Sequence, residues 1–396
     1  MTREDINQEI ISKEGNNLII ELPTGTGKTK IAIDKVKEWN KDEAPDSTLL
    51  IVVPRNVLKQ TWKEELEKWW PDCKLLIHYT TYVSLPKCKG TWDYCIMDEG
   101  HHLSERCREA LCDFNIAHSL ICSATIGKQL KDELKEIFDG LNTYKKNLRD
   151  VIENNILPDP KVYLVPLELN NTTMSEVIFR NPKLKGRVIT CTWAERWKYF
   201  HQKTNPVKIY CTEKQYISDL DSQIDYWKRK YSRTNSPIAK NKWLRLCSER
   251  LKWLSSRKEN VVSAIQQVLS EYRTLTFCNN IEQTKKLGKY CINSKNKYSK
   301  TYLESFNKGR INHITACNVL NEGVNLVNCQ VGIYANLNSS ETIIKQRTGR
   351  LLRHPNPVIV IPYFKDTRDE ELVSKMLENY NMDLVIKTQK LDEIVI

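Results

Sequence analysis

The amino-acid sequence predicts an α/β protein built from repeated strand–turn–helix units. Short apolar runs, such as residues 18–20 and 47–53, are each followed by a turn and then by a segment with helical spacing of apolar residues. The chain has 396 residues, which is enough for two or three domains. Apolar residues make up 40% of the chain and charged residues 28%, a balance typical of a globular protein with a substantial core.

The composition narrows the class of protein further. No apolar run reaches the ~18 residues of a membrane span, and residues 1–5 do not begin a signal peptide. The 13 cysteines include no C-x-x-C pair, so we expect free thiols in a reducing cytosol. We therefore expect a cytoplasmic protein with no membrane partner. The net charge of +12 suggests a polyanionic partner.

A glycine-rich turn at residues 21–29, E-L-P-T-G-T-G-K-T, lies between a predicted strand and a predicted helix. This is the context of a phosphate-binding loop, although Leu22 stands where the strict pattern has glycine. Backbone N–H groups would hold a β-phosphate at the helix N-terminus, Lys28 would reach the β- and γ-phosphate oxygens, and the Thr29 hydroxyl would bind Mg²⁺. A plain polar turn is the alternative. The predicted nucleotide-binding residues are Thr24, Gly25, Thr26, Gly27, Lys28 and Thr29.

Two adjacent carboxylates, Asp98 and Glu99, follow an apolar strand at residues 92–97. The carboxyl end of a buried strand is where an α/β nucleotide-hydrolysing protein needs them. We predict that Asp98 holds Mg²⁺ through water and that Glu99 is the general base that polarises the attacking water. His101 and His102 follow directly, but without a third cluster of ligands we do not expect a structural metal there.

A resemblance to a known family appears once residues 119–125 are included. The motifs P-T-G-T-G-K-T, D-E-G-H-H and S-A-T occur in this order and spacing. Together they look like the first RecA-like domain of a superfamily 2 helicase, with the DExH spelling. The resemblance implies that Gln8, about a dozen residues before the glycine-rich turn, reads the adenine edge, although a solvent-facing glutamine is an equal alternative.

The same resemblance extends to the C-terminal part of the chain. Residues 318–325, N-V-L-N-E-G-V-N, resemble motif V of the family, in which Asn325 replaces the usual aspartate and Gly323 is a candidate nucleotide contact. Residues 346–353, Q-R-T-G-R-L-L-R, match motif VI. On a helix Gln346, Arg350 and Arg353 would share one face. The resemblance implies that this face meets the nucleotide, with Arg350 and Arg353 as arginine fingers beside the catalytic Lys28 and Glu99.

The resemblance implies two RecA-like domains with an ATP and Mg²⁺ site between them. We predict a first domain at residues 1–150, a linker strand plus a basic helical hairpin at 151–268, and a second domain at 269–396. The implied function is a DNA helicase or translocase, because the motif VI spelling is similar to the DNA repair, phage repair and restriction-motor branch. A prokaryotic or phage-infected cell is the expected setting.

Several alternatives to this function remain open. An RNA-dependent DExH helicase would carry the same motifs, and the chain could be the motor subunit of a restriction, defence or replication complex with protein partners. A nucleotide-gated clamp is a third possibility, against which Glu99 and the two arginines argue. The resemblance also implies that Arg55 and Thr81 contact the nucleic acid, whereas an ordinary strand end is an equal alternative for Thr81.

The segment between the two motif sets carries no family motif but has its own pattern. Apolar residues recur with helical spacing in two stretches, residues 217–231 and 244–254, which predicts an antiparallel helical hairpin. Within 226–258 there are eleven Lys and Arg against one acid. We predict a nucleic-acid arm that uses Lys228, Arg229, Lys230 and Trp243. The alternative is that the aromatic residues fill the hairpin interior, which is as plausible for Trp227 and Tyr231, whereas we expect an exposed or docking role for Trp243 and Trp253.

Overall fold

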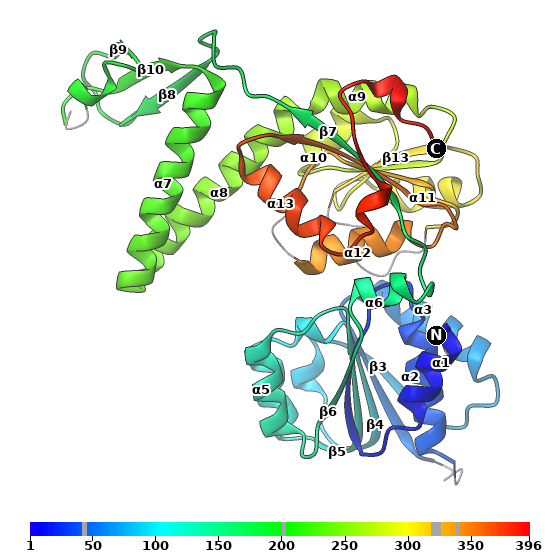
Figure 1. Cartoon of the computed structure of the whole chain (residues 1–396). Coiled ribbons are helices and arrows are strands. Elements are labelled where there is room, and N and C mark those ends of the chain that lie inside the picture. Colours follow the sequence, from blue (N-terminus) through cyan, green and yellow to red (C-terminus); the bar gives the residue numbers. More distant parts are fainter. Residues whose placement is uncertain (42–45, 200–202, 318–325, 338–340) are drawn as a thin grey trace.

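Two α/β domains and a projecting insertion make up the computed structural model of the chain (Figure 1). The structure describes residues 1–41, 46–199, 203–317, 326–337 and 341–396. The two domains contact each other along one edge, and the insertion extends from the second domain (Figure 1). None of the described helices combines the length and the apolarity needed to cross a bilayer.

The first domain contains a six-stranded sheet in the order β3-β2-β4-β5-β1-β6, in which every pairing is parallel. Parallel sheets need cover on both faces. Apolar side chains of α1, α2 and α3 pack on one face, and those of α4 and α5 pack on the other. The strands are β1 (Asn17–Glu21), β2 (Thr48–Val53), β3 (Leu76–Thr81), β4 (Thr91–Asp98), β5 (Asn115–Ser123) and β6 (Asn142–Lys145); the helices are α1 (Arg3–Ile11), α2 (Lys28–Trp39), α3 (Asn56–Trp69), α4 (Glu105–Cys112), α5 (Lys128–Ile137) and α6 (Leu148–Glu153).

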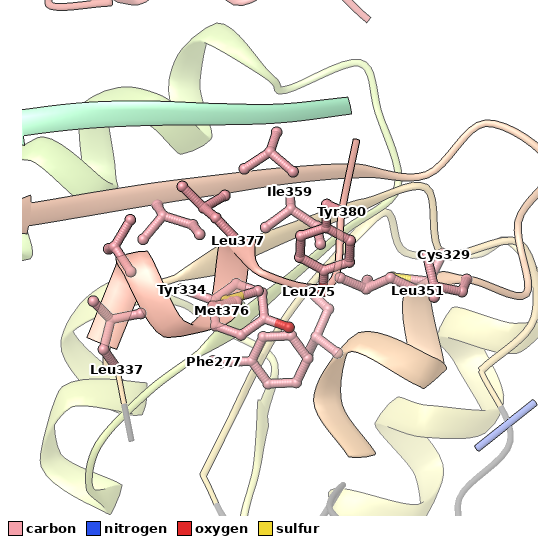
Figure 2. Close-up of a cluster of buried hydrophobic side chains, with 14 of the residues drawn as sticks. Leu275, Phe277, Cys329, Tyr334, Leu337, Leu351, Ile359, Met376, Leu377 and Tyr380 are labelled. Atoms are coloured by element: carbon pink, nitrogen blue, oxygen red, sulfur yellow. The ribbon is translucent and has the colours of Figure 1, made fainter. Parts of the chain in front are cut away.

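The second domain contains a seven-stranded parallel sheet in the order β12-β13-β11-β14-β15-β7-β16. Its main core lies between the sheet and helices α11, α12 and α13 (Figure 2). The strands are β7 (Lys161–Leu167), β11 (Thr274–Phe277), β12 (Cys291–Ile292), β13 (His313–Ala316), β14 (Val331–Tyr334), β15 (Val358–Phe364) and β16 (Val385–Lys387); the helices are α9 (Glu259–Val268), α10 (Ile281–Leu287), α11 (Ser299–Asn307), α12 (Glu341–Leu351) and α13 (Arg368–Leu377). Both domains are therefore parallel-sheet α/β units of the RecA-like type.

One strand lies elsewhere than the sequence predicted. The strand at Lys161–Leu167, expected in a linker, is β7 of the second sheet, where all seven residues pair with β15 from Lys161↔Val358 to Leu167↔Phe364. The chain thus enters the second sheet before the insertion, and α9 returns it to the same domain. Sequence pattern predicts a strand but not its partner, because this partner lies almost 200 residues further along the chain.

The insertion contains a small sheet as well as two helices. Its three strands, in the order β8-β10-β9, are β8 (Glu176–Arg180), β9 (Ile189–Thr192) and β10 (Val207–Cys211), and its helices are α7 (Glu213–Thr234) and α8 (Pro237–Arg257). The small sheet was not predicted. The small sheet is joined directly to α7, since a single residue, Thr212, separates β10 from the helix. Thr212 is the N-cap of α7 and forms a capping box with Gln215. The two helices run side by side away from the small sheet (Figure 1).

The buried face of α8 differs from the predicted one. Leu244, expected inside the hairpin, is 48% exposed, whereas Leu246 is buried. Trp243 and Trp253, for which an exposed or docking role was expected, are only partly exposed and pack against the hairpin core, where their rings meet Tyr231 and Tyr216, respectively. Of the residues predicted for this face, Cys247 and Leu254 pack in the hairpin core as expected, and only Leu244 is wrong.

Candidate functional site

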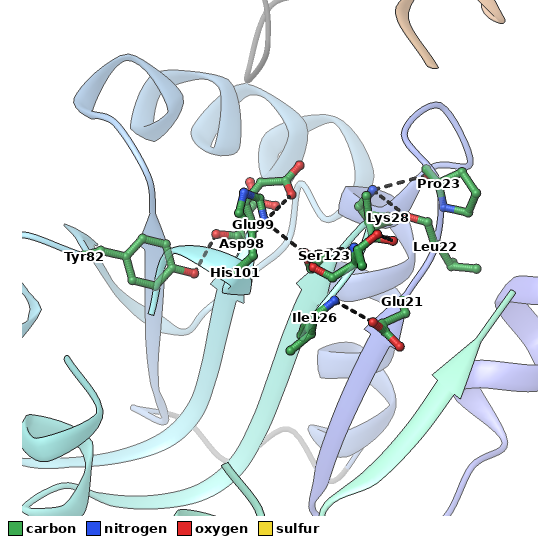
Figure 3. A network of polar contacts seen from close by, with 12 residues as sticks. Glu21, Leu22, Pro23, Lys28, Tyr82, Asp98, Glu99, His101, Ser123 and Ile126 are labelled. Carbon is green, nitrogen blue, oxygen red and sulfur yellow. Dashed lines mark hydrogen bonds and ion pairs between the residues drawn. The ribbon is translucent and has the colours of Figure 1, made fainter. Parts of the chain in front are cut away.

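The glycine-rich turn forms a closed loop around the Lys28 side chain. The Lys28 ammonium donates hydrogen bonds to the carbonyl oxygens of Leu22 (3.0 Å) and Pro23 (3.3 Å) (Figure 3). The Thr26 hydroxyl donates to the Pro23 carbonyl oxygen at 2.8 Å. Gly25 and Gly27 each have φ of 93°, a left-handed conformation that favours glycine. These two glycines let the chain turn sharply into α2, whose N-terminus starts at Lys28 and includes Thr29 in its first turn.

Three motifs meet at one edge of the first sheet because their strands are parallel. The register pairs Glu21, before the loop, with Ser123, and pairs Asp98 with Cys122. The carboxyl ends of β1, β4 and β5 therefore lie together, which brings the loop, the two carboxylates and the S-A-T segment side by side (Figure 3). This is the juxtaposition that the sequence predicted for Lys28, Asp98 and Glu99.

Asp98 lies in a buried setting that favours its protonated form. Burial and the neighbouring Glu99 raise the pKa of Asp98 to about 6, while a hydrogen bond from Trp62 and the charge of Lys28 act in the opposite direction. Trp62 Nε1 donates to Asp98 Oδ2 at 2.9 Å, and the Tyr82 hydroxyl donates to the Asp98 backbone carbonyl at 2.7 Å. These two bonds fix the position of Asp98 at the end of β4.

Glu99 has a strained backbone and a buried carboxylate oxygen without a hydrogen-bond donor. Its φ of 52° and ψ of 55° lie in the left-handed region, which is uncommon for a residue other than glycine. Its Oε2 atom is buried without a hydrogen-bond donor and lies 3.4 Å from His101 Nδ1. A carboxylate held in this way can accept a proton from a water molecule.

His101 connects Glu99 to the S-A-T segment. A hydrogen bond of 3.0 Å joins His101 Nδ1 and the Ser123 hydroxyl, which donates its own proton to the Thr125 carbonyl at 3.1 Å. Ser123 therefore accepts from His101, so that Nδ1 carries the proton and lies beside the Glu99 carboxylate. The intervening Gly100 is required, because a Cβ there would lie 2.4 Å from Ile121.

Helix α12 of the second domain contacts the phosphate loop of the first. A Cβ on Gly349 would lie 1.7 Å from the Thr24 hydroxyl oxygen, and a Cβ on Gly25 would lie 3.4 Å from the Gly349 carbonyl oxygen. The two backbones thus approach each other as closely as glycine permits. Motif VI and the phosphate loop form one continuous site at the junction of the domains.

The core of the second domain fixes the orientation of α12. The Thr348 hydroxyl is completely buried and lies within hydrogen-bonding distance of the hydroxyls of Tyr334 (3.1 Å) and Tyr380 (3.0 Å). Arg347, 2% exposed, donates to the Asn336 carbonyl at 3.1 Å and lies over the Phe277 ring. Arg347 is therefore a positioning residue within motif VI, inaccessible to nucleotide.

The predicted motif VI residues do not all lie on the helix. Gln346 is 2% exposed and Arg350 6% exposed, and both belong to α12. Arg353, expected on the same helical face, lies beyond the helix end at Leu351 and within electrostatic reach of Arg3 and Glu65 of the first domain. The helix ends there because Pro355 and Pro357 disfavour its continuation. Arg350 is thus the better-placed finger candidate.

Gln8 and Gly323 are the two other residues predicted to contact the nucleotide. Gln8 is exposed on α1, and its amide donates to Glu4 at 3.2 Å. Gly323 and the rest of the motif V segment lie outside the described residues.

The predicted nucleic-acid residues divide into exposed and enclosed ones. Arg55 is exposed at the N-cap of α3. Thr81 is only 6% exposed and its hydroxyl contacts Ser84 at 3.3 Å, which does not match a contact on an open surface. Trp243 is half-buried inside the hairpin. The basic residues of α7 are exposed as expected: Lys228, Arg229 and Lys230.

Sequence reasoning missed the residues that support the site. Trp62, Tyr82 and His101 contact the carboxylates, and the buried Glu21 accepts a hydrogen bond from the Ile126 backbone and pairs with Lys131. Glu21 gave a signal as a charged residue that ends an apolar strand, and His101 gave one as part of the D-E-G-H-H motif, two residues after Glu99. The contacts of Trp62 and Tyr82 with Asp98 join residues that lie far apart in the sequence.

The residues present fit a nucleoside triphosphate bound with a divalent cation. The loop presents an ammonium and the N-terminus of a long helix, the combination that binds phosphates. The partly buried carboxylate of Asp98 and the Thr29 position in the first turn of α2 provide oxygen donors of the kind Mg²⁺ prefers.

Comparisons with known proteins agree with this geometry. Residues 3–84 match a family model described as the type III restriction enzyme res subunit, and residues 257–355 match the helicase conserved C-terminal domain. A search of curated proteins found no match.

Solved structures of helicases share the fold over nearly the whole chain. Dbp5 from S. cerevisiae, bound to RNA and ADP BeF3, has a TM-score of 0.59 and 11% identity, over 98% of this chain and 88% of that one. The helicase domain of Hef from Pyrococcus furiosus has a TM-score of 0.51 and 14% identity, over 94% and 97%. The DNA-bound type ISP restriction-modification enzyme LlaBIII has a TM-score of 0.56 and 13% identity, over 100% of this chain but 32% of that one.

The fold and the site define a two-domain helicase architecture. The two family models match in the order that this architecture requires, one in each domain. The chain is similar to superfamily 2 helicases in these two segments and in its fold.

Proposed function

We propose that the chain is an ATP-driven DNA helicase or translocase of the DExH type, whose hydrolysis is stimulated by nucleic acid. The observation that carries the proposal is the contact between α12 and the phosphate loop, through Gly349, Thr24 and Gly25. Because residues from both domains line one site, the state of the bound nucleotide can alter how the domains meet. Alternate closing and opening of two domains that grip a strand produces stepping along it.

Each residue of the site has a proposed role. Lys28 and Thr29 bind the phosphates and the cation, Asp98 holds the cation through water, and Glu99 takes the proton of the attacking water. The cation supplies positive charge to the phosphate oxygens. Arg350 adds its guanidinium to the γ-phosphoryl group, where charge builds up in the transition state.

The basic insertion supports a nucleic-acid track, and DNA is our first choice of polymer. The similarity of residues 3–84 to a restriction-enzyme subunit and of the fold to a DNA-bound restriction-modification enzyme support DNA. The same observations also favour a second candidate function, the motor of a restriction complex with protein partners. Similarity to Dbp5, which was solved with RNA, supports the RNA-dependent rival.

The proposal is tested by steady-state ATP hydrolysis without nucleic acid and with single-stranded DNA, forked duplex DNA or RNA. We expect DNA to stimulate turnover and Lys28→Ala to abolish it under every condition. Stimulation by RNA alone would favour the RNA-dependent rival. Absence of stimulation by any polymer would reject a motor that works without a partner protein.

A further inference from the structure

One face of the small sheet in the insertion is open and carries aromatic side chains. Strand residues alternate between two faces, so every second residue of β8, β9 and β10 points to the same side. On this outer face Phe179 is 43% exposed and Tyr210 is 42% exposed. All six residues of the outer face are exposed: Val177, Phe179, Thr190, Thr192, Lys208 and Tyr210.

The strand register arranges the aromatic rings and a basic side chain next to each other. Lys208 pairs with Phe179, and Tyr210 pairs with Val177. The Lys208 ammonium lies 5.8 Å from the centre of the Phe179 ring, within the range of a cation–π contact. Phe179 and Tyr210 are diagonal neighbours, about 7–8 Å apart at such positions.

The opposite face is buried and packs the sheet against the start of the hairpin. Ile178, Ile209 and Cys211 form its core, against which Tyr216 of α7 packs. An ion pair of 2.6 Å between Arg180 and the largely buried Asp219 adds a polar connection to α7. The outer face is thus presented on a fixed support.

The charge of the small sheet and its loops indicates a polyanionic ligand. Residues 174–211 contain eight Lys and Arg but only two acids, Glu176 and Glu195. Glu176 is itself ion-paired with Arg257 of α8. Lys183, Lys185 and Arg187, in the connection between β8 and β9, are all exposed.

We propose that the outer face binds single-stranded nucleic acid, with bases stacked on Phe179 and Tyr210 and a phosphate on Lys208. Aromatic rings accept any base by stacking, and adjacent basic residues track the backbone. The inference rests on the proposed function, since it assumes that the chain acts on nucleic acid. It adds a base-contacting site outside the two motor domains.

The outer face and the basic part of the hairpin lie at opposite ends of α7. The small sheet joins the start of this 22-residue helix, and Lys228 to Arg233 lie roughly 20–30 Å further along it. A strand held at the outer face can therefore be contacted a second time by the hairpin without crossing the motor domains.

The experiment measures binding of fluorescein-labelled dT20 and rU20 to the full chain without nucleotide, by anisotropy at one fixed salt concentration. We expect Phe179→Ala and Tyr210→Ala each to weaken binding about tenfold. Phe179→Trp and Tyr210→Phe should bind within about threefold of the unmodified chain, because they keep a stacking ring. The dT20 and rU20 arms show whether the outer face prefers DNA or RNA.

The matched control is Tyr298→Ala, which removes a 50% exposed aromatic ring from the second domain. It should leave binding unchanged, and thermal melting should show that every variant is folded. The proposal is overturned if the double variant Phe179→Ala, Tyr210→Ala binds as tightly as the unmodified chain, or if the unmodified chain binds neither oligonucleotide.

A second measurement separates this inference from the proposed function and from a protein ligand. Ring-dependent binding without any ATP hydrolysis would reject the proposed function and keep the inference. Hydrolysis that nucleic acid stimulates, together with binding that does not depend on the two rings, would keep the proposed function and reject the inference. Sedimentation that shows a dimer which Phe179→Ala dissociates would overturn the inference by assigning the outer face to a second copy.

Discussion

Asp98, the proposed ligand of the cation, is a carboxylate whose surroundings raise its pKa. Burial and the neighbouring Glu99 raise its pKa to about 6, so the folded protein holds this proton more tightly than the unfolded chain does. Protonated Asp98 therefore stabilises the fold at low pH, and this contribution is lost as the pH rises through about 6. The ionised form, which is the one a cation needs, is gained over the same range.

We accordingly predict that the Mg²⁺ concentration needed for half-maximal ATP hydrolysis rises steeply below pH 6. Proton and cation compete for Asp98, so the requirement should increase about tenfold per pH unit there and level off above pH 7. Titrations of Mg²⁺ at pH 5.0 to 8.0 test this, with excess Mg²⁺ restoring turnover at the acidic end. A requirement that stays constant from pH 5.0 to 8.0 would show that Asp98 does not control the cation.

Glu99 is predicted to act through proton transfer, separately from nucleotide binding. The isosteric change Glu99→Gln keeps the shape but removes the basic group, so turnover should fall by a factor of about 10²–10⁴ while ATP affinity changes little. Hydrolysis assays together with equilibrium binding of a fluorescent ATP analogue measure the two effects. Glu105→Gln, at an exposed acid on α4, is the control. Undiminished turnover in Glu99→Gln would refute the assignment of the base.

At the scale of elements, a buried ion pair joins the hairpin to the second domain. Lys258, between α8 and α9, lies 2.5 Å from Asp369 in the first turn of α13, and both side chains are at most 2% exposed. Asp369 Oδ2 also accepts from the Phe364 backbone at 3.4 Å. The pair fixes where the hairpin leaves the domain.

Removing one partner of this pair should destabilise the protein more than removing both. Lys258→Met leaves a buried unpaired carboxylate, so we predict a loss of about 3–5 kcal/mol, measured by urea denaturation. The double variant Lys258→Met, Asp369→Leu should recover most of the lost stability. Lys286→Met, which breaks a half-exposed pair with Glu259, should cost less than about 1 kcal/mol. Equal stability of Lys258→Met and the unmodified chain would contradict this account.

The exposed basic residues of α7 are predicted to bind nucleic acid. Changing Lys228, Arg229 and Lys230 together to Glu should weaken DNA binding and flatten its dependence on salt, because fewer counterions are released. Hydrolysis without nucleic acid should stay unchanged, since these residues lie outside the ATP site. Salt-dependent binding curves provide the measurement.

The control for charge alone reverses three exposed lysines of the first domain, Lys128, Lys135 and Lys145. It changes the net charge by the same amount but lies on α5 and β6. Equal weakening by both triple variants would mean that total charge, rather than the hairpin, governs binding.

Sequence pattern predicted some elements and missed others for identifiable reasons. The strands that end in Glu21, Asp98 and Ser123 are apolar and local, and their parallel pairing follows from the fold class, so the site could be assembled before the structure was known. The partner of β7 and the turn at Arg353 depend on distant residues or on the end of a helix. The small sheet has strands of four or five residues with polar alternation, too short to stand out.

In the molecule as a whole, the two domains share one candidate site. Thr348, Arg347 and Leu351 fix α12 on the second domain, and Gly332 allows Leu351 to pack closely, since a Cβ there would lie 2.1 Å from it. Gly349 then brings the same helix against the phosphate loop. A change at the nucleotide can thus reach the insertion through the second domain.

The most direct test of this claim is ATP hydrolysis by Arg350→Ala, with ATP binding measured in parallel. We predict that ATP affinity stays within about threefold while turnover in the presence of DNA falls by about 10³ or more. Arg350→Lys should recover only part of the lost turnover, because lysine lacks a planar guanidinium that can donate two hydrogen bonds at once. Turnover of Arg350→Ala within tenfold of the unmodified chain would contradict the account, because the first domain would then hydrolyse ATP without the second.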